Sequence, residues 1–318
     1  MIKKQLKNIF FNIHNLMNTN KKYIKNIQNN NYLTILNLHK VSLENNPFYP
    51  PLTPLLFEEL IKYIIENFNV ITFNQITSQN NSKKPDIILS FDDGYYDFLE
   101  HAMPIMKKYN IKANLNIIPS CIENQEPMWN IKLYDFLNSS PLNLIKEIKI
   151  NNFNYQISKK NKDKFGMLLG RHLKQMQREK REKILETLQP IFEKNSNIKY
   201  TRMLNKKEIL EISKNHEIGV HSYSHESMGY ESDDFFREDF FKCQEYFKNI
   251  LQLPMDIYAF PNGSYRENQL EFLFDNNINS VLLVNNAYSK YNTKTHNRFT
   301  YYADSESEAK LRAVGFYR

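Results

Sequence analysis

The chain alternates between short apolar runs and longer stretches in which apolar residues recur every three or four positions. The short runs predict buried strands, and the longer stretches predict amphipathic helices. We expect strands at residues 32–38, 70–73, 86–91, 112–118, 217–221, 256–260, 280–284 and 298–302. We expect helices around 55–65 and at 97–109, 205–215, 233–251, 266–276 and 305–313. This alternation of strand and helix is typical of βα units and a parallel sheet.

Two segments depart from this alternation. Residues 1–30 predict a helical or loosely ordered N-terminal extension. Between about 120 and 200, charged helix-forming sequence dominates, as at 165–194, and no strand pattern is present. We therefore expect residues 31–318 to form the main body of the fold, interrupted by a helical insertion at about 120–200. A chain of 318 residues is long enough for one barrel or for two ordinary domains.

A pair of adjacent carboxylates follows the expected strand at 86–91. The sequence there is Ser-Phe-Asp-Asp-Gly, so Asp92 and Asp93 lie where an apolar run ends at a glycine turn. Successive side chains of a strand point to opposite faces, and the two carboxylates are therefore expected to have different roles. Because Asp and Gly are also common turn residues, a plain polar turn is the alternative.

A pair of histidines follows a second expected strand. His221 and His225 belong to the sequence His-Ser-Tyr-Ser-His, directly after the strand-like residues 217–220. One carboxylate and two imidazoles make a three-ligand site with an open position, which is the arrangement of a catalytic zinc. The other carboxylate is then free to act as a base on water. The alternative is one exposed imidazole and one that is hydrogen-bonded in the interior.

A third stretch, Ala-Phe-Pro-Asn-Gly-Ser-Tyr at residues 259–265, follows the expected strand at 256–260. Taken together and in this order, the three motifs resemble those of the polysaccharide deacetylase (NodB-homology) family, carbohydrate esterase family 4. The resemblance covers roughly residues 32–302. It implies an α/β fold, a distorted (β/α) barrel of the polysaccharide deacetylase type, with the helical insertion at its rim. All three motifs follow expected strands, and the carboxyl ends of strands are where such barrels hold their catalytic side chains.

The resemblance also implies roles for individual residues. The metal ligands are Asp93, His221 and His225, with Zn²⁺ as the expected ion and Co²⁺ or Ni²⁺ as alternatives. Asp92 is the expected catalytic base, and the backbone N–H of Asn262 is the expected donor to the oxyanion. The expected reaction is metal-dependent hydrolysis of a C–N (non-peptide) amide that removes an N-acetyl group from a bacterial sugar, with removal of an O-acetyl group as the alternative.

The sequence departs from the fuller family pattern at two points. Some members have an arginine that restrains the base two residues before the proline, where this chain has Ala259. Some also have a later Leu-x-His motif whose histidine is the general acid. His296 lies in the corresponding region and is the candidate for that role, although its surroundings match poorly. Arg298 is a candidate partner for a site carboxylate, and His39 resembles a histidine near the site in many relatives.

The charge and the N-terminus bear on partners and location. The net charge of +7 and pI of about 9.0 favour anionic partners such as phosphorylated glycans, lipid-linked saccharides or a membrane surface, with dispersed solvated lysines as the alternative. No basic–aromatic motif for nucleic acid is present. Residues 1–20 contain lysines but no apolar stretch of signal-peptide length. We expect a cytoplasmic protein, with a basic, Phe-containing N-terminus that either contacts the inner membrane face or is a plain solvated helix.

The expected substrate is an acetylated saccharide used in surface-polysaccharide or lipopolysaccharide assembly for the cell envelope, since no export signal is recognised. A glycoside hydrolase with Asp92 and Asp93 as its acid/base pair is one alternative. It fits poorly, because adjacent strand residues point apart and do not flank one glycosidic bond. A catalytically degenerate glycan-binding protein is the other alternative, because the arginine at 259 is absent and the general acid is uncertain.

Overall fold

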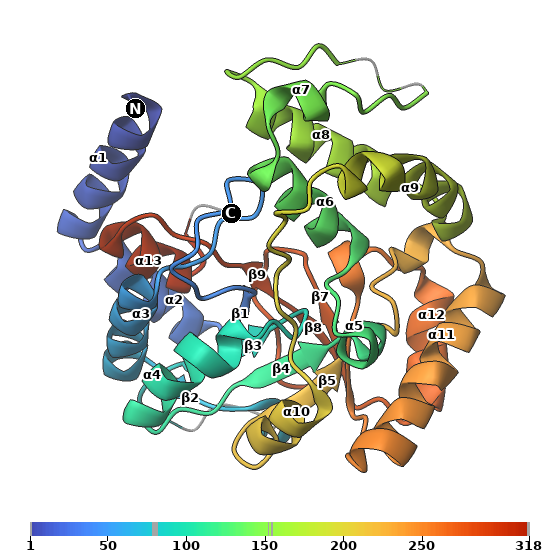
Figure 1. Ribbon diagram of the computed structural model, residues 1–318. Helices are drawn as coiled ribbons and strands as arrows, with labels where there is room; N and C mark the ends of the chain where they lie inside the picture. The colour runs from blue at the N-terminus through green and yellow to red at the C-terminus, as the bar shows by residue number, and fades with distance from the viewer. Residues whose placement is uncertain (1, 78–81, 152, 154, 317–318) are drawn as a thin grey trace.

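The fold is built on a curved parallel sheet, seen in a computed structural model that describes residues 2–77, 82–151, 153 and 155–316 (Figure 1). The strand order is β8-β7-β6-β5-β4-β3-β1-β9, and β2 pairs with β3. The strands are β1 Thr34–Leu38, β2 Asn69–Val70, β3 Asp86–Phe91, β4 Asn114–Ile117, β5 Glu217–Val220, β6 Ile257–Ala259, β7 Ser280–Leu283, β8 Thr295–Asn297 and β9 Phe299–Thr300. Only Arg298 separates β8 from β9, the two ends of this order, so the sheet curls into a nearly closed barrel.

Helices cover the outside of the barrel (Figure 1). They are α3 Pro54–Asn67, α4 Met103–Lys108, α10 Lys206–Ile212, α11 Asp233–Glu245, α12 Glu267–Asp275 and α13 Glu306–Ala313. Helix α3 shows why the sequence folds in this way: Thr53 caps it by accepting from the Leu56 N–H, and Pro54 occupies its first turn. The apolar residues at helical spacing in α3 are buried against the sheet. The expected α/β barrel is thereby confirmed.

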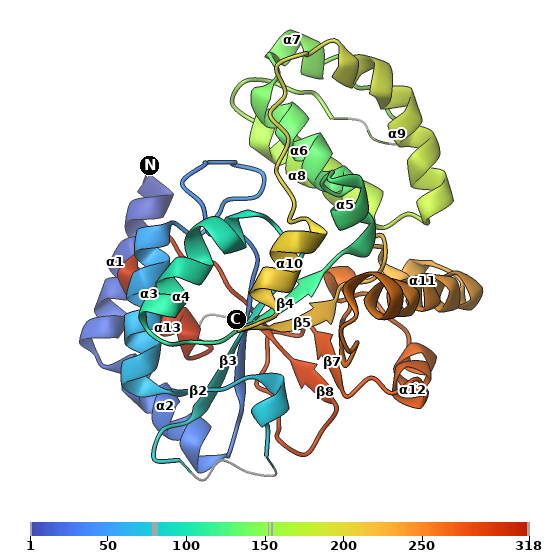
Figure 2. The ribbon, with the colours of Figure 1, turned by 60° about the horizontal axis from the view of Figure 1, so that its bottom comes forward.

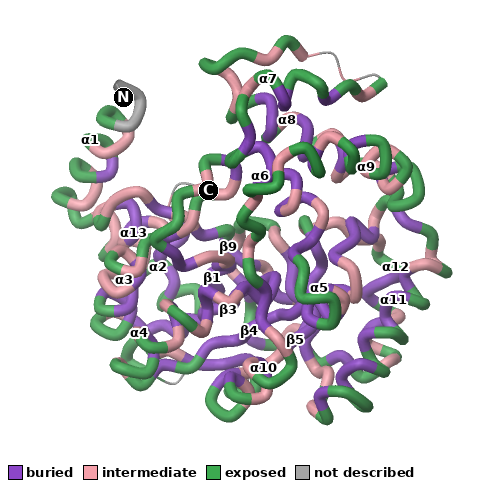
Figure 3. Tube along the Cα trace, viewed as in Figure 1, coloured by how far each residue is buried: buried purple, intermediate pink, exposed green. Residues whose placement is uncertain are grey.

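The two-residue period of the strands separates the outer core from the interior of the barrel. On β3, Ile87 and Leu89 belong to the large apolar cluster that includes the surrounding helices. Ile88 instead belongs to a smaller cluster with Ile35 of β1 and Leu282 of β7, which fills the barrel. The inward row of β3 therefore continues from Ile88 towards its carboxyl end, where the first motif begins. Figure 3 shows the strands buried along most of their length.

Several expected elements differ from those observed. The strand expected at 70–73 stops at Val70 and is followed by a 3₁₀ turn, Phe73–Gln75. The helix expected at 97–109 starts as a π-helical turn, Phe98–Ala102. Strand β8 was not expected at all, because Thr-His-Asn has no apolar run to mark it.

Residues between β4 and α10 form helices with an apolar core of their own. They are α5 Pro119–Asn124, α6 Trp129–Ser139, α7 Leu142–Ile145, α8 Lys162–Lys174 and α9 Arg178–Glu193. Phe136, Leu169 and Leu173 are buried in their shared cluster. Because α5 begins two residues after β4 ends, this group of helices stands on the carboxyl-end side of the barrel, where Figure 2 shows it as a separate lobe.

The N-terminal residues form two helices, α1 Ile2–Leu16 and α2 Thr19–Asn29. Helix α1 packs against α13, and the Lys7 ammonium lies 2.9 Å from a carboxylate oxygen of Asp304 and 2.8 Å from one of Glu308. Within the described ranges, no helix combines the length and the apolar character that crossing a membrane requires.

Candidate metal centre

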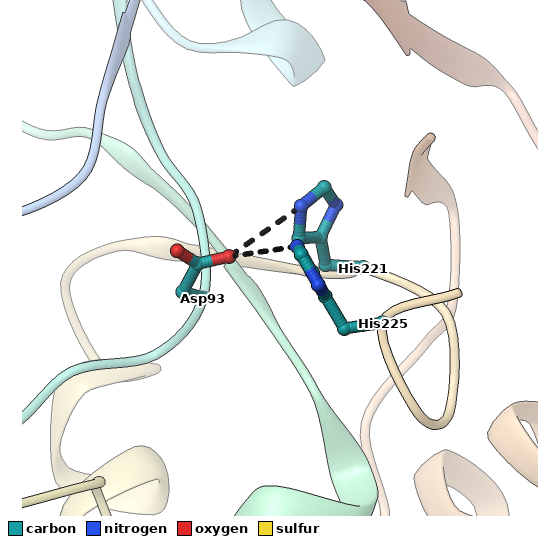
Figure 4. Close-up of side chains that lie close together, drawn as sticks. All are labelled: Asp93, His221 and His225. Carbon is teal, nitrogen blue, oxygen red and sulfur yellow. Dashed lines mark ion pairs between the residues drawn. The ribbon is translucent and has the colours of Figure 1, made fainter. Parts of the chain in front are cut away.

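Three side chains from the first two motifs meet at the carboxyl end of the barrel (Figure 4). Asp93 follows β3, His221 follows β5, and His225 lies in the loop beyond it. The Nε2 atoms of both histidines are 3.5 Å from Oδ1 of Asp93, and all three residues are buried. Tetrahedral ligands at ~2.0–2.1 Å from a zinc ion are themselves about 3.3–3.4 Å apart. The observed spacing thus needs little adjustment to hold such an ion.

The backbone of the two motifs adopts conformations that residues other than glycine rarely take. The φ angles are 80° at Asp93, 55° at Ser222 and 60° at His225. Residues held in the left-handed region cost free energy and concentrate at functional sites. Here the unusual turns direct the ligand side chains towards one point.

The protonation of the two histidines suits metal binding. The Nδ1–H of His221 donates to the backbone carbonyl of Ala259 at 2.8 Å, so the lone pair of Nε2 faces Asp93. Burial lowers the pKa of His225 well below its usual value and keeps that ring neutral at pH 7. Oδ1 of Asp93 is buried without a hydrogen-bond partner among the described residues. A carboxylate oxygen and two imidazole nitrogens with free lone pairs fit a divalent cation.

The second carboxylate, Asp92, is held by a different set of contacts. Arg298 donates from Nη1 to Oδ1 and from Nη2 to Oδ2, each at 2.8 Å. Asn116 donates to Oδ1 at 2.7 Å, and Gly219 leaves room for it, since a Cβ there would lie 2.2 Å from Oδ1 of Asn116. Burial alone raises the pKa of Asp92, but the charge and hydrogen bonds of Arg298, together with the nearby His221 and His39, outweigh burial and hold that pKa well below its usual value. Oδ2 of Asp92 lies 3.8 Å from Nε2 of His221, which puts an ionised carboxylate beside the ligand group.

Arg298 was expected as a candidate partner for a site carboxylate, whereas Asn116 was not expected at the site. Arg298 joins β8 to β9, is fully buried, and also donates to Ser90 Oγ at 3.0 Å. Its guanidinium holds the Asp92 carboxylate, a contact that the Ala259 side chain cannot make. The available signal was polar residues at alternate positions of short strands, such as Asn114 and Asn116 in β4, which point into the barrel.

Asn262 lies in the turn that follows β6. Its φ of 56° is left-handed, and its side-chain amide donates to Ser227 Oγ at 3.0 Å. No acceptor for its backbone N–H is found among the described residues. Asn262 lines a cavity of about 550 Å³ between the barrel loops and helix α8. The N–H is thus available to a molecule bound there.

His296, the expected general acid, lies away from the three candidate metal ligands. It belongs to β8, two positions before Arg298 on the inward row and therefore nearer the amino ends of the strands. Its Nδ1 is hydrogen-bonded to Ser289 Oγ at 2.9 Å, and its ring packs 5.5 Å from that of Phe73. Burial lowers the pKa of His296 to about 4. The structure thus does not bring His296 to the ligand group, and we do not retain it in the mechanism.

His39 occupies a position nearer the ligand group. It follows β1, and its ring packs 5.6 Å from that of Tyr49. Burial lowers the pKa of His39, while the charges of Asp93 and Asp92 partly counteract that effect. A neutral imidazole beside two carboxylates at the end of β1 can hold or transfer a proton.

The parallel barrel thus holds a buried His-His-Asp group at the carboxyl ends of its strands. A family model described as polysaccharide deacetylase matches residues 79–279, more than half of the chain. The chain therefore belongs to the polysaccharide deacetylase family. Comparison with curated proteins gave no match.

Solved structures of deacetylases share the fold. The Streptococcus pyogenes deacetylase PplD in complex with acetate is 16% identical with a TM-score of 0.60, over 89% of this chain and 98% of that one. IcaB from Ammonifex degensii is 15% identical with a TM-score of 0.55, over 89% and 97%. A de-N-acetylase from Aggregatibacter actinomycetemcomitans is 15% identical with a TM-score of 0.54, over 84% and 93%. At these identities the similarity establishes the fold alone.

Proposed function

We propose that the protein is a metal-dependent deacetylase that hydrolyses the N-acetyl group of a sugar. The observation that carries the proposal is the position of Asp92. This ionised carboxylate is held by Arg298 beside the three candidate metal ligands, one aspartate and two histidines. Zn²⁺, or alternatively Co²⁺ or Ni²⁺, bound by Asp93, His221 and His225 would polarise the acetyl carbonyl and lower the pKa of water.

Groups of the protein supply the proton transfers and stabilise the negative oxygen. Asp92 accepts a proton from the attacking water, a contribution of ~10²–10⁴-fold in such reactions. The Asn262 N–H donates to the oxygen that becomes negative, and one such donor contributes ~10²–10³-fold. His39 is the group we assign to accept that proton from Asp92 and pass it to the leaving amine, because it lies near both aspartates whereas His296 does not.

The experiment that tests the function combines metal content with product release. Protein purified without chelator is analysed for bound metal and then assayed for acetate with N-acetylated and O-acetylated saccharides. We expect about one ion per chain and acetate release that stops in Asp92→Asn. Failure to bind any divalent ion after reconstitution would contradict the proposal.

The same assay separates the two alternatives. A glycoside hydrolase would produce new reducing ends without a metal, but Arg298 keeps Asp92 ionised and so unsuited to donate a proton to a leaving sugar. A glycan-binding protein would bind saccharides equally well with Asp92→Asn and release no acetate from any of them.

Helix α1 supports a second part of the proposal, which is contact with an anionic membrane that carries lipid-linked saccharide precursors for surface-polysaccharide assembly. Its exposed apolar residues recur at helical spacing, with Leu6, Ile9, Ile13 and Leu16 at 60%, 54%, 50% and 81% exposure. Residues 1–30 contain no Asp or Glu, and their basic residues are Lys3, Lys4, Lys7, Lys21, Lys22 and Lys25. A cytoplasmic location stays a prediction.

Vesicle sedimentation tests this contact. The full chain should bind vesicles that contain phosphatidylglycerol and bind much less to neutral phosphatidylcholine vesicles. Ile9→Ser with Ile13→Ser should abolish binding, whereas Leu43→Ser, which changes another exposed residue (76%) outside α1, should not. Equal binding by both variants would refute a role for α1.

A further inference from the structure

Helix α8 brings two cations to the cavity beside the metal centre. Arg171 and Lys174 are three positions apart, so they share one face of the helix. Both line the cavity of about 550 Å³, opposite barrel-loop residues that include Ser227, Asn262 and Ser264. No Asp or Glu lines this cavity, and among the described residues no carboxylate oxygen lies within 4.0 Å of either cation.

The two cations differ in exposure. Lys174 is half-buried and lines the cavity together with Ser227, which lies two positions after the ligand residue His225. Arg171 is one turn towards the amino end of α8 and is exposed.

The helix that carries them is seated on aromatic rings. Gly166 and Gly170 allow a close approach, because a Cβ would lie 2.3 Å from the ring of Phe48 and 2.2 Å from the Tyr134 hydroxyl oxygen. Phe48 and Tyr134 stack with ring centroids 5.8 Å apart and also line the cavity. The cations are thus presented by a helix that is fixed against two buried rings.

We propose that Arg171 and Lys174 form an anion subsite, which binds a phosphate or carboxylate on the sugar next to the acetylated one. The inference rests on the proposed deacetylase function. Neither cation has a carboxylate oxygen within 4.0 Å among the described residues, and an anion in the cavity would give both a counter-charge through charge-assisted hydrogen bonds. Arginine presents a planar fork to such groups, and lysine adds a point charge. The substrate class is therefore an acidic saccharide rather than a neutral one.

The test compares acetate release by the metal-loaded protein from three matched N-acetylated disaccharides, which carry a phosphate, a carboxylate or neither on the neighbouring sugar. We expect kcat/KM to be at least tenfold higher for one of the anionic forms, and the preferred form identifies the anion. Arg171→Gln with Lys174→Met should remove this preference, mainly through KM, so that the three substrates react with equal kcat/KM. Lys164→Met, on the same helix but exposed and outside the cavity, should retain it.

Equal kcat/KM for the three substrates in the wild type, or an unchanged preference in the double variant, would overturn the subsite. Failure of the deacetylase function gives a different result, since no substrate would then release acetate. In that case calorimetric binding of the phosphorylated and neutral disaccharides still tests the subsite. Tighter binding of the phosphorylated form that is lost in the double variant supports the subsite, and equal binding refutes it.

Discussion

Arg298 donates to both carboxylate oxygens of Asp92 across 206 positions of sequence, each at 2.8 Å. Asp92 follows β3 and Arg298 joins β8 to β9, so the two residues are brought together because the sheet curls on itself. Both side chains are buried, so the pair is screened little by water. The contact keeps the proposed base ionised and fixed in orientation.

Replacing Arg298 by Gln should shift the pH dependence of activity. In the wild type the depressed pKa of Asp92 keeps the base form present into the acidic range. Without the guanidinium, burial raises that pKa, so the acid limb of the kcat profile should move to higher pH. The free energy of unfolding should fall by ~3–5 kcal/mol, because a buried charge loses its partner.

Steady-state assays between pH 4 and 9 measure the shift, and denaturant unfolding measures the stability. Arg202→Gln serves as the control, since it removes a 54% exposed arginine that pairs with Glu208 at the surface. An acid limb at the same pH in Arg298→Gln would show that Arg298 does not set the ionisation of Asp92.

Substitutions of the two carboxylates in the first motif should have different effects on the metal content. Asp93→Ala and His225→Ala should each lose the bound ion, since each removes one of three donors. Asp92→Asn should retain the ion and lose ~10²–10⁴-fold in kcat. Inductively coupled plasma mass spectrometry on dialysed protein gives the stoichiometry. Loss of metal from Asp92→Asn, or its retention in Asp93→Ala, would contradict these roles.

A buried ion pair fixes the insertion to the loop that carries His225. Arg181 of α9 donates to both carboxylate oxygens of Glu226 at 2.7 and 2.8 Å, and its guanidinium lies 4.8 Å from the centre of the Trp129 ring. Arg181→Met should cost ~3–5 kcal/mol in unfolding, and Arg181→Met with Glu226→Met should recover most of it. Metal affinity in the single variant should fall by about tenfold, because the loop beside His225 loses its support.

Lys183→Met, which breaks an exposed pair with Glu179, is the matched control and should change neither quantity. Metal affinity is measured by competition with a chromophoric chelator. Additive effects of the Arg181 and Glu226 substitutions on unfolding would mean that the pair is not coupled.

Asp97 should make the metal-free protein less stable as the pH rises. This buried carboxyl accepts from the Val41 N–H, and burial raises its pKa to about 7. Between the unfolded value of ~3.9 and about 7 the folded state binds more protons than the unfolded state, so stability falls with increasing pH in that window. Asp97→Asn cannot titrate, and its stability relative to wild type should rise by about 2–4 kcal/mol from pH 4 to 7.

Urea unfolding of both proteins at pH 4, 5.5, 7 and 8 measures this difference. It should level off above pH 7, where the wild-type carboxyl is ionised in both states. A difference that stays constant across the series would mean that the pKa of Asp97 is not raised in the folded protein.

The sequence by itself determined the elements that have a local signature. The apolar run at Asp86–Phe91 specifies a buried strand, and the Asp-Asp-Gly turn after it puts the two carboxylates at the strand end. The similar position of His221 after β5 then follows from the order of parallel strands, since their carboxyl ends share one edge. Strand β8 was not predicted, because its three residues are polar and form no apolar run.

Only the tertiary structure decided which side chains meet. Nothing local to Arg298 indicates that it contacts Asp92, because that contact depends on closure of the sheet between β9 and β8. The position of His296 below the site depends on the register of β8 against β7, and a shift of one residue would have reversed which side chains face inwards. The approach of Arg171 to the cavity likewise depends on how the insertion packs on the barrel. Periodicity encodes which face of an element is buried, whereas partners distant in sequence are set by closure, register and packing.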